Sequence, residues 1–393
     1  MARFLGIRLV QAVVTLIVYM TVTYFILQAM PGDITILFTQ NPRITAEVRQ
    51  ELAYRLGLDQ PWYLQYLNYM KNIFTGNLGV SFSQYPRPVW DIIAERAPRT
   101  VVLFFTATVV SFYIGFLLGR IIAWHRGTRF DYAATAAGVT FWTAFYPLLG
   151  LIMMWLFAYT LQLVPLNQFI TPAIWRDARL SSNQVFGMML ANMALFSGLL
   201  LVGYGFGIPR IGTVSGRVLT EIGLWGGGLL ATGAWWAQSG LARYALDILS
   251  HMVLPVATLS LVSFGGSMLL MRDSMLETIR EDYVMAARAR GLPERTVRDR
   301  YAARTALLPV ITSLTLSIGF VVSGGIVTET VFSWPGLGLT LLEAARLYDY
   351  PLATGAFAFT GIFVVVAHIV ADILHALLDP RLRVVGGEVT AAE

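Results

Sequence analysis

The sequence predicts an all-α integral membrane protein, and three observations support that class. Hydrophobic residues make up 56% of the 393 residues and charged residues only 13%, whereas a soluble domain is usually about one quarter charged. Apolar runs long enough to cross a bilayer as helices recur along the chain. Arginines, which are nearly all of its basic residues, cluster at the ends of these runs and so act as topology signals.

Several classes of function are excluded by composition. The chain has no cysteine, which removes disulfide frameworks, thiolate catalysis and cysteine-ligated metals. Lys71 is the only lysine, and no GxxxxGK[ST] phosphate-binding loop occurs. We therefore expect that any ATP on which this chain depends is bound by another chain.

Apolar runs of spanning length define the candidate membrane helices, and the first of them belongs to a retained N-terminal span, residues 1–30. The fifth run is the weakest, because it is short and rich in glycine. The eight runs are Leu9–Ala29, Val101–Trp124, Tyr132–Leu161, Val185–Ile208, Leu219–Trp236, Met252–Met271, Ala306–Val331 and Leu352–Leu378.

Arginine placement orients these spans, since cytoplasmic loops are enriched in Lys and Arg. Eight spans place both termini in the cytoplasm, and the same orientation results if the fourth and fifth runs fail to span. The arginines used are Arg3, Arg8, Arg120, Arg126, Arg129, Arg210, Arg217, Arg288, Arg290, Arg295, Arg298, Arg300, Arg304, Arg381 and Arg383.

Residues 31–99 are expected to form an external subdomain. They include an amphipathic stretch with Thr45 as its N-cap and Gly57 as its C-terminal stop. The aromatic residues that follow suit a position at the level of the lipid headgroups. Residues 100–385 are expected to form the transmembrane core, and residues 386–393 a C-terminal tail.

A block of charge, EDYVMAARARGLPERTVRDRY, lies at Glu281–Tyr301 between apolar segments. Six nearby arginines would each cost about 2.5–3.5 kcal/mol at mid-bilayer, so the block is predicted to be cytoplasmic. Residues 274–290 predict one helix, Gly291 a left-handed C-terminal residue, and Pro293 the start of a second helix. A small apolar face of Tyr283, Ala286 and Ala287 with charged flanks suits docking into a groove. A solvated loop that only enforces topology is the alternative.

Asp282-Tyr283-x-x-Ala286-Ala287-Arg288-Ala289-Arg290-Gly291-Leu292, followed by Arg304-x-Ala306-Leu307-Leu308-Pro309, resembles the coupling loop of binding-protein-dependent ABC importer permeases. The closest subgroup is the dipeptide/oligopeptide/nickel type. Further ordered matches, including GNLGVSFSQYPRPVWDIIAERAPRT and TETVFSWPGLGLTLLEAARLYDYPLATG, extend the resemblance over residues 1–165 and 245–384.

The resemblance implies a type I ABC importer-like transmembrane domain with six core spans, in a prokaryotic plasma (inner) membrane. It implies a permease subunit for short peptides that is not itself an enzyme and binds no cofactor, with oligosaccharide or nickel as alternative cargo. The implied partners are a second permease, giving a heterodimer, two ATP-binding subunits that carry ATP and Mg, and an external substrate-binding protein. The residues it assigns to ATPase coupling, within a loop of residues 273–305, are Asp282, Tyr283, Ala286, Ala287, Arg288, Gly291, Leu292, Pro293 and Arg304.

Two features depart from the family pattern. Met285 stands where the broader motif has an acidic residue, and residues 166–244 form an insert in which the resemblance lapses. We expect the insert to be a peripheral helical hairpin, which brings the total to eight spans. A layer on the membrane surface is the alternative.

Three other groups of residues suggest other functions. His368, Asp372, His375 and Asp379 form one helical stripe, which would suit a proton-coupled secondary transporter or a metal site, or else faces the bundle. Ser323-Gly324-Gly325 would suit an intramembrane protease only with a histidine close by, and otherwise marks close helix packing. Phe332, Trp334, Pro335 and Gly336 predict an external gate or binding-protein contact, or an aromatic anchor at the interface.

Overall fold

The computed structural model describes residues 2–29, 60–203, 214–321 and 325–378. These residues form helices and connecting turns, with no strand beyond a single isolated bridge between Val80 and Pro88. The expected all-α class is therefore confirmed over the described ranges. The chain divides into two compact units, Met1–Met153 with Pro255–Glu393 (unit 1) and Met154–Leu254 (unit 2).

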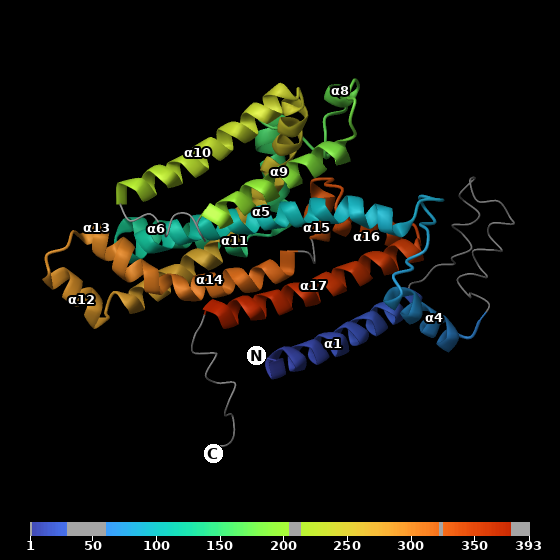
Figure 1. Ribbon diagram of the computed structural model, residues 1–393, viewed down its shortest axis with the longest axis horizontal. Helices are drawn as coiled ribbons and strands as arrows, with labels where there is room; N and C mark the ends of the chain where they lie inside the picture. The colour runs from blue at the N-terminus through green and yellow to red at the C-terminus, as the bar shows by residue number, and fades with distance from the viewer. Residues whose placement is uncertain (1, 30–59, 204–213, 322–324, 379–393) are drawn as a thin grey trace, which may run out of the picture. The chain divides into compact units, whose positions relative to one another are not determined.

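Unit 1 contains most of the helices (Figure 1). They are α1 (Ala2–Gln28), α4 (Trp62–Phe74), α5 (Val89–Trp124), α6 (Arg129–Thr143), α7 (Tyr146–Met153), the larger part of α11 (Ala242–Thr278), α12 (Asp282–Ala289), α13 (Glu294–Thr296), the π-helical turn η4 (Val297–Ala302), α14 (Ala303–Phe320), α15 (Ile326–Val331), α16 (Leu337–Arg346) and α17 (Tyr350–Leu378).

Helices α5 and α11 pack at close range because small residues line their contact. A Cβ added to Gly115 or Gly119 would overlap atoms of α11, at Ser267 and Met271 among others. The Ser267 hydroxyl also donates to the carbonyl of Ser111 at 3.3 Å. Small residues and interhelical hydroxyl bonds are the usual means by which helices associate in lipid, where no hydrophobic driving force acts between them.

Helices α1 and α17 lie side by side (Figure 1), and the aromatic helix α4 packs on α1. The hydroxyls of Tyr66 in α4 and Thr21 in α1 are 2.7 Å apart, and the hydroxyl of Tyr24 in α1 donates to the carbonyl of Trp62 at 3.3 Å. The helix expected from Thr45 to Gly57 lies outside the described residues.

Unit 2 contains the insert, with η1 (Met154–Thr160), α8 (Pro172–Trp175), α9 (Ser182–Val202), α10 (Val214–Gln238) and the start of α11. A capping box between Ser181 and Gln184 begins α9, and α9 and α10 pack against each other. The expected hairpin of two further spans is not confirmed, because α10 is not among the helices that qualify as spans. Buried Asp247 accepts hydrogen bonds from the amide of Thr171 at 2.9 Å and the indole of Trp175 at 2.7 Å, which fastens the loop before α9 to α11.

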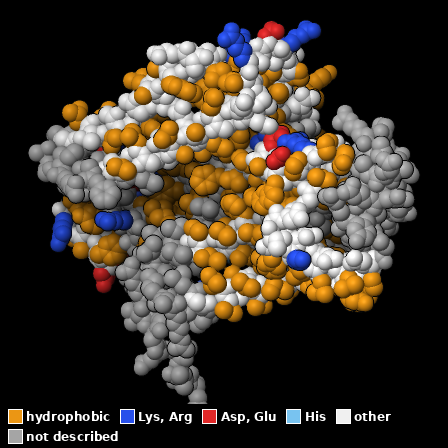
Figure 2. All heavy atoms as spheres, turned by 45° about the vertical axis from the view of Figure 1, so that its right-hand side comes forward, with side chains coloured by type: hydrophobic (Ala, Val, Ile, Leu, Met, Phe, Trp, Pro, Cys, Tyr) orange, Lys and Arg blue, Asp and Glu red, His pale blue; other side chains and the backbone are white. Residues whose placement is uncertain are grey.

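Among the described residues, five helices are long and apolar enough to cross a membrane, or six if one bent pair counts as a single span. They are Arg8–Gln28, Val89–Trp124, Ser182–Leu200, Ala242–Thr278 and Tyr350–Val370, with Arg129–Thr143 and Tyr146–Thr160 as the pair bent by 105°. The expected eight spans are not confirmed. Hydrophobic side chains cover much of the face shown in Figure 2, as lipid-facing helices require.

Two predicted spans differ in shape from the expectation. The run Tyr132–Leu161 bends at Ala144, and Ala306–Val331 is split, because α14 ends at Phe320 and α15 begins at Ile326. Helix α10 forms over 25 residues but is not among the five helices that qualify. Its several glycines lower its hydropathy relative to leucine-rich helices.

Candidate functional site

The short helix α12 forms the centre of the predicted coupling loop and packs back onto its own unit. Val284 is fully buried and Ala287 is 3% exposed, both within an apolar cluster that includes Met271 and Met275 of α11. The expectation of one continuous helix from Ser274 to Arg290 is therefore wrong. The chain turns between Thr278 and Asp282 because this turn lets α12 bury its apolar side.

The opposite side of α12 is exposed and bears small or flexible apolar side chains. Tyr283 is 40% exposed and Met285 52% exposed, and Ala286 is also exposed. Asp282 and Arg290 lie exposed at its two ends. The three residues expected on one face therefore lie on two sides of α12. Tyr283 and Ala286 are exposed and available to a partner, whereas Ala287 is buried and holds the helix in place.

The turn after α12 has the predicted conformation. Gly291 has φ +74°, the left-handed region that glycine adopts without steric cost. Arg288 donates to Glu294 at 3.2 Å across the turn, and its guanidinium lies 5.0 Å from the centre of the Trp124 ring. Leu292 packs on the apolar cluster, and Pro293 is the N-cap of α13. These contacts fix the orientation of α12 relative to α5 and α13.

Asp299 ties the second half of the loop to α5. Arg298 donates to its carboxylate at 2.7 and 2.9 Å, and Arg120 of α5 lies 3.5 Å away. The hydrogen bond from Arg298, with the positive charges of Arg298 and Arg120 added, holds the pKa of Asp299 below its ordinary value. Arg304, the last predicted coupling residue, is exposed near the start of α14.

The helices α15 and α16 lie at the end of unit 1 opposite α12 (Figure 1). The residues expected at a gate meet there, but their side chains are largely internal to the chain. Trp334 is fully buried and Phe332 is 3% exposed, while Pro335 is only partly buried. The indole of Trp334 donates to the carbonyl of Arg99 at 3.2 Å. Within the described residues, this cluster holds α5 against α15, α16 and the turn of residues 332–336 between them (the α15–α16 corner).

Glu329, which sequence reasoning missed, organises that corner. Its fully buried carboxylate accepts from the Thr100 hydroxyl at 2.7 Å and from the amide of Leu339, in the first turn of α16, at 2.8 Å. Thr100 in turn accepts from the amide of Leu337 at 2.8 Å. An acceptor oxygen at a helix N-terminus satisfies amides that lack a partner inside the helix. The signal in the sequence is an acidic residue in an apolar stretch shortly before Gly336.

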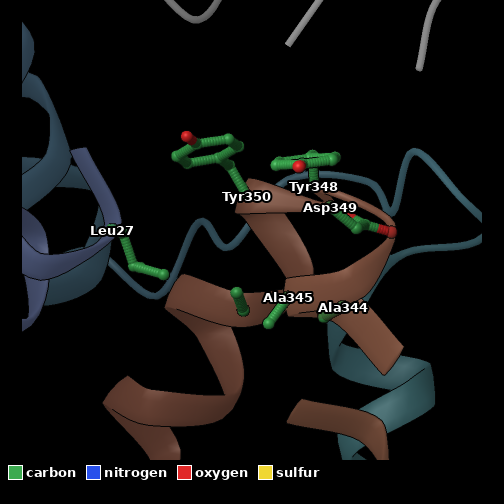
Figure 3. Close-up of a pocket in the computed structure, with 7 residues that line it drawn as sticks. Leu27, Ala344, Ala345, Tyr348, Asp349 and Tyr350 are labelled. Carbon is green, nitrogen blue, oxygen red and sulfur yellow. The ribbon is translucent and has the colours of Figure 1, made fainter. Parts of the chain in front are cut away.

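Asp349, also missed, closes the other end of α16. Its fully buried carboxylate accepts from the Ser81 hydroxyl at 2.5 Å, from the amide and hydroxyl of Ser83 at 2.8 and 2.6 Å, and from the amide of Leu352 at 3.2 Å. Figure 3 shows the Asp349 carboxylate pointing away from the rings of Tyr348 and Tyr350, and these residues help to line a small pocket. With about 10 Å³ of space, the pocket holds one water at most and cannot be a peptide site.

The other candidate groups gain no support from geometry. Nδ1 of exposed His368 lies 2.8 Å from the carbonyl of Val364 in its own helix. The side chains of Asp372 and His375, together with Asp379 and Ser323, lie outside the described residues. Within the part of the chain that the structure describes, no group of three metal-binding side chains occurs.

Comparisons with known proteins agree with the resemblance. A family model described as binding-protein-dependent transport system inner membrane component matches residues 115–384, and a model of the N-terminal part of such components matches residues 1–104. The chain is 28% identical to the dipeptide transport system permease protein DppB of Escherichia coli (strain K12), over 98% of this chain and 99% of that protein.

Two other relatives are similar over comparable lengths. Identity is 29% to the di/tripeptide transport system permease protein DppB of Pseudomonas aeruginosa (strain UCBPP-PA14), covering 98% of this chain and 99% of that protein. Identity is 28% to the oligopeptide transport system permease protein AppB of Bacillus subtilis (strain 168), covering 98% and 100%. Since the first family model covers well over half of the chain, this protein belongs to the family of binding-protein-dependent transport system inner membrane components.

Proposed function

We propose that the chain is a permease subunit of an ATP-driven importer for short peptides and forms half of the translocation path. The observation that carries this proposal is α12, an exposed helix with a small apolar face whose buried side is locked to α11. A helix held in this way transmits a push from a docked partner to the membrane helices. Peptide as cargo is inferred from the names of the relatives.

The remaining parts of the assembly follow from the family. The proposed partners are a second, different permease, two ATP-binding subunits that supply ATP and Mg, and an external binding protein. Both termini would then lie in the cytoplasm, with α12 facing the ATP-binding subunits. Tyr283, Ala286 and Arg290 would contact the ATP-binding subunit directly, whereas Ala287, Gly291, Leu292 and Pro293 would set the position of α12.

The α15–α16 corner is proposed to act at the opposite, external end. Because Trp334 and Phe332 are buried, they would shape the corner from inside rather than touch a binding protein themselves. Pro335 and Gly336 would hold the turn that begins α16. Residues 31–99 would lie on the same side of the membrane.

Affinity capture tests the coupling proposal. The tagged chain is purified in mild detergent from its native cells, and copurifying ATP-binding subunits are identified. Ala286→Arg places a bulky charge on the exposed face of α12 and should abolish their capture. Ala173→Arg, on an exposed alanine of α8 at the predicted external side, is the matched control and should leave capture unchanged. Equal capture by both variants would contradict docking through α12.

Uptake into reconstituted vesicles tests the transport class and the cargo. A labelled dipeptide should accumulate only when ATP and the binding protein are present, and an uncoupler should have no effect. Accumulation that follows a proton gradient without ATP would instead favour a secondary transporter. Competition by an oligosaccharide or by nickel, but not by peptides, would retain the machinery and change the cargo.

A further inference from the structure

A buried ion pair joins the start of α6 to α11 near the predicted coupling loop. Asp131 is 2% exposed, and Arg272 donates to both of its carboxylate oxygens, from Nε at 3.0 Å and from a terminal nitrogen at 3.2 Å. The amide of Gly127 and the hydroxyl of Thr135 donate to the same carboxylate at 3.0 and 3.3 Å. Bidentate pairs of this kind fix geometry as well as charge.

A second contact joins the same two helices further along. A Cβ added to Gly265 of α11 would overlap the carbonyl oxygen of Gly138 of α6, so the two backbones touch. Asp131 and Gly138 are seven residues apart, as are Gly265 and Arg272, which is about 10.5 Å along each helix. Helices α6 and α11 are therefore antiparallel and fixed at two points two turns apart, and they cannot slide or rotate independently.

The C-terminal end of α11, which ends at Thr278, is also fixed to α12. Hydrogen bonds from the amides of Ile279 and Glu281 to the carbonyls of Met275 and Thr278 make a tight turn between them. Val284 of α12 packs in the same cluster as Met271 and Met275. A displacement of α12 therefore moves the end of α11 that bears Arg272.

The far end of this path reaches the α15–α16 corner. Helix α6 ends at Thr143, and α7 leaves it at an angle as part of the bent pair. Helix α7 packs against α15, where Gly150 lies beneath the side chains of Val331 and Phe332. A Cβ at Gly150 would come within 3.2 Å of Val331. Phe332 belongs to the corner that Glu329 holds together.

We propose that α6 and α7 form a strut that carries movement of α12 to the α15–α16 corner, with Asp131 and Arg272 as the positioning residues that anchor it. This inference rests on the proposed coupling function of α12. The ion pair gives the strut its fixed end, the Gly138–Gly265 contact keeps it aligned, and Gly150 meets the corner. A pair that served only to stabilise the fold would affect folding, capture of partners and transport together.

The test separates transmission from folding. In vesicles containing the complete transporter, Asp131→Asn removes the charge with little change in shape, and Arg272→Lys keeps the charge but loses the two-point contact. Asp273→Asn is the matched control, because its carboxylate is exposed and lies 3.5 Å from the same guanidinium without joining the buried pair. Capture of ATP-binding subunits, ATP hydrolysis and peptide uptake are measured for each variant.

A direct readout of the corner is available because the chain has no cysteine of its own. Leu347→Cys, 47% exposed after α16, is labelled with a membrane-impermeant maleimide with and without trapped nucleotide. In the otherwise unchanged chain the labelling rate should depend on nucleotide. In Asp131→Asn and Arg272→Lys this dependence, and the peptide moved per ATP, should fall about three- to tenfold, the size expected for residues along a coupling route.

The outcomes are distinct. If ATP-binding subunits fail to bind the unmodified chain, the proposed function fails, and the strut fails with it. If they bind, and both pair variants keep the nucleotide-dependent labelling and the uptake per ATP of the control, the strut is wrong. It is also wrong if capture falls in step with labelling, because the pair then only stabilises the fold. Arg272→Lys decides the matter if Asp131→Asn does not yield folded protein.

Discussion

Replacing Gly336 by alanine tests the buried carboxylate network at the α15–α16 corner. The backbone at Gly336 has φ −103°, which alanine adopts freely, so any effect comes from the added methyl group. That methyl group would overlap the Glu329 carboxylate and the Thr100 hydroxyl, which are hydrogen-bonded to each other. The substitution must therefore separate these groups or move the start of α16.

The expected cost combines two effects. Forcing an extra carbon into a packed site costs about 1–3 kcal/mol, and leaving a buried polar group without its partner costs about 1–3 kcal/mol more. The free energy of unfolding should fall by about 2–6 kcal/mol on these grounds. It is measured by titrating the purified chain from mild detergent into a denaturing detergent.

Gly187→Ala is the matched control for this prediction. Gly187 lies within α9 and has no atom within 4 Å of an added Cβ. Alanine there should stabilise the helix by about 0.5–1 kcal/mol. A loss below about 1 kcal/mol for Gly336→Ala would refute the reasoning, because a fixed network cannot absorb the methyl group at so small a cost.

Three further substitutions are predicted from local geometry. Gly291→Ala should cost about 1–2 kcal/mol because its φ is +74°, and Gly291→Asn should cost less, as measured by unfolding in mixed micelles. Asp349→Asn should lower the free energy of unfolding by about 1–3 kcal/mol, because an amide keeps only one of the two oxygens that accept from Ser81, Ser83 and Leu352. Asp273→Asn, at an exposed carboxylate, is the control and should be neutral. The pKa of Asp299 is held below its ordinary 3.8, so the stability that its charge contributes is present above pH 3.8 and is lost as pH falls through the lowered pKa. The difference in Tm between the unchanged chain and Asp299→Asn should therefore shrink below about pH 4.

Local sequence signals predicted the turns better than the helix lengths. Gly291 has the expected left-handed conformation because only the residue type and its neighbours decide it. The break after Thr278 was missed because residues 274–290 are good helix formers, and the gain from burying Val284 and Ala287 against α11 is a tertiary effect. Local propensity contains no information about that contact.

The limits of α5 show the same difficulty. The span was expected to begin at Val101, but the helix begins at Val89 and continues through Pro98. The first turns are held by contacts that are remote in sequence, since Val89, Ile92 and Ile93 pack with Leu352 and Ala353 of α17. Hydropathy alone identifies the part of a helix that faces lipid, and it omits a polar extension that packs on the protein.

The two ends of unit 1 are held by interactions of different stiffness. Around α12 most contacts are apolar, since Val284, Ala287 and Ala302 pack with Met271 and Met275, and apolar burial is non-directional. At the opposite end, Glu329 and Asp349 accept directed hydrogen bonds from other segments, and such bonds weaken steeply when bent. A force applied at α12 should therefore pass to α11 through this packing and the turn after Thr278, whereas α15 and α16 should move as one piece. It follows that a stiff link such as α6 is needed if movement at α12 is to reach that corner undiminished.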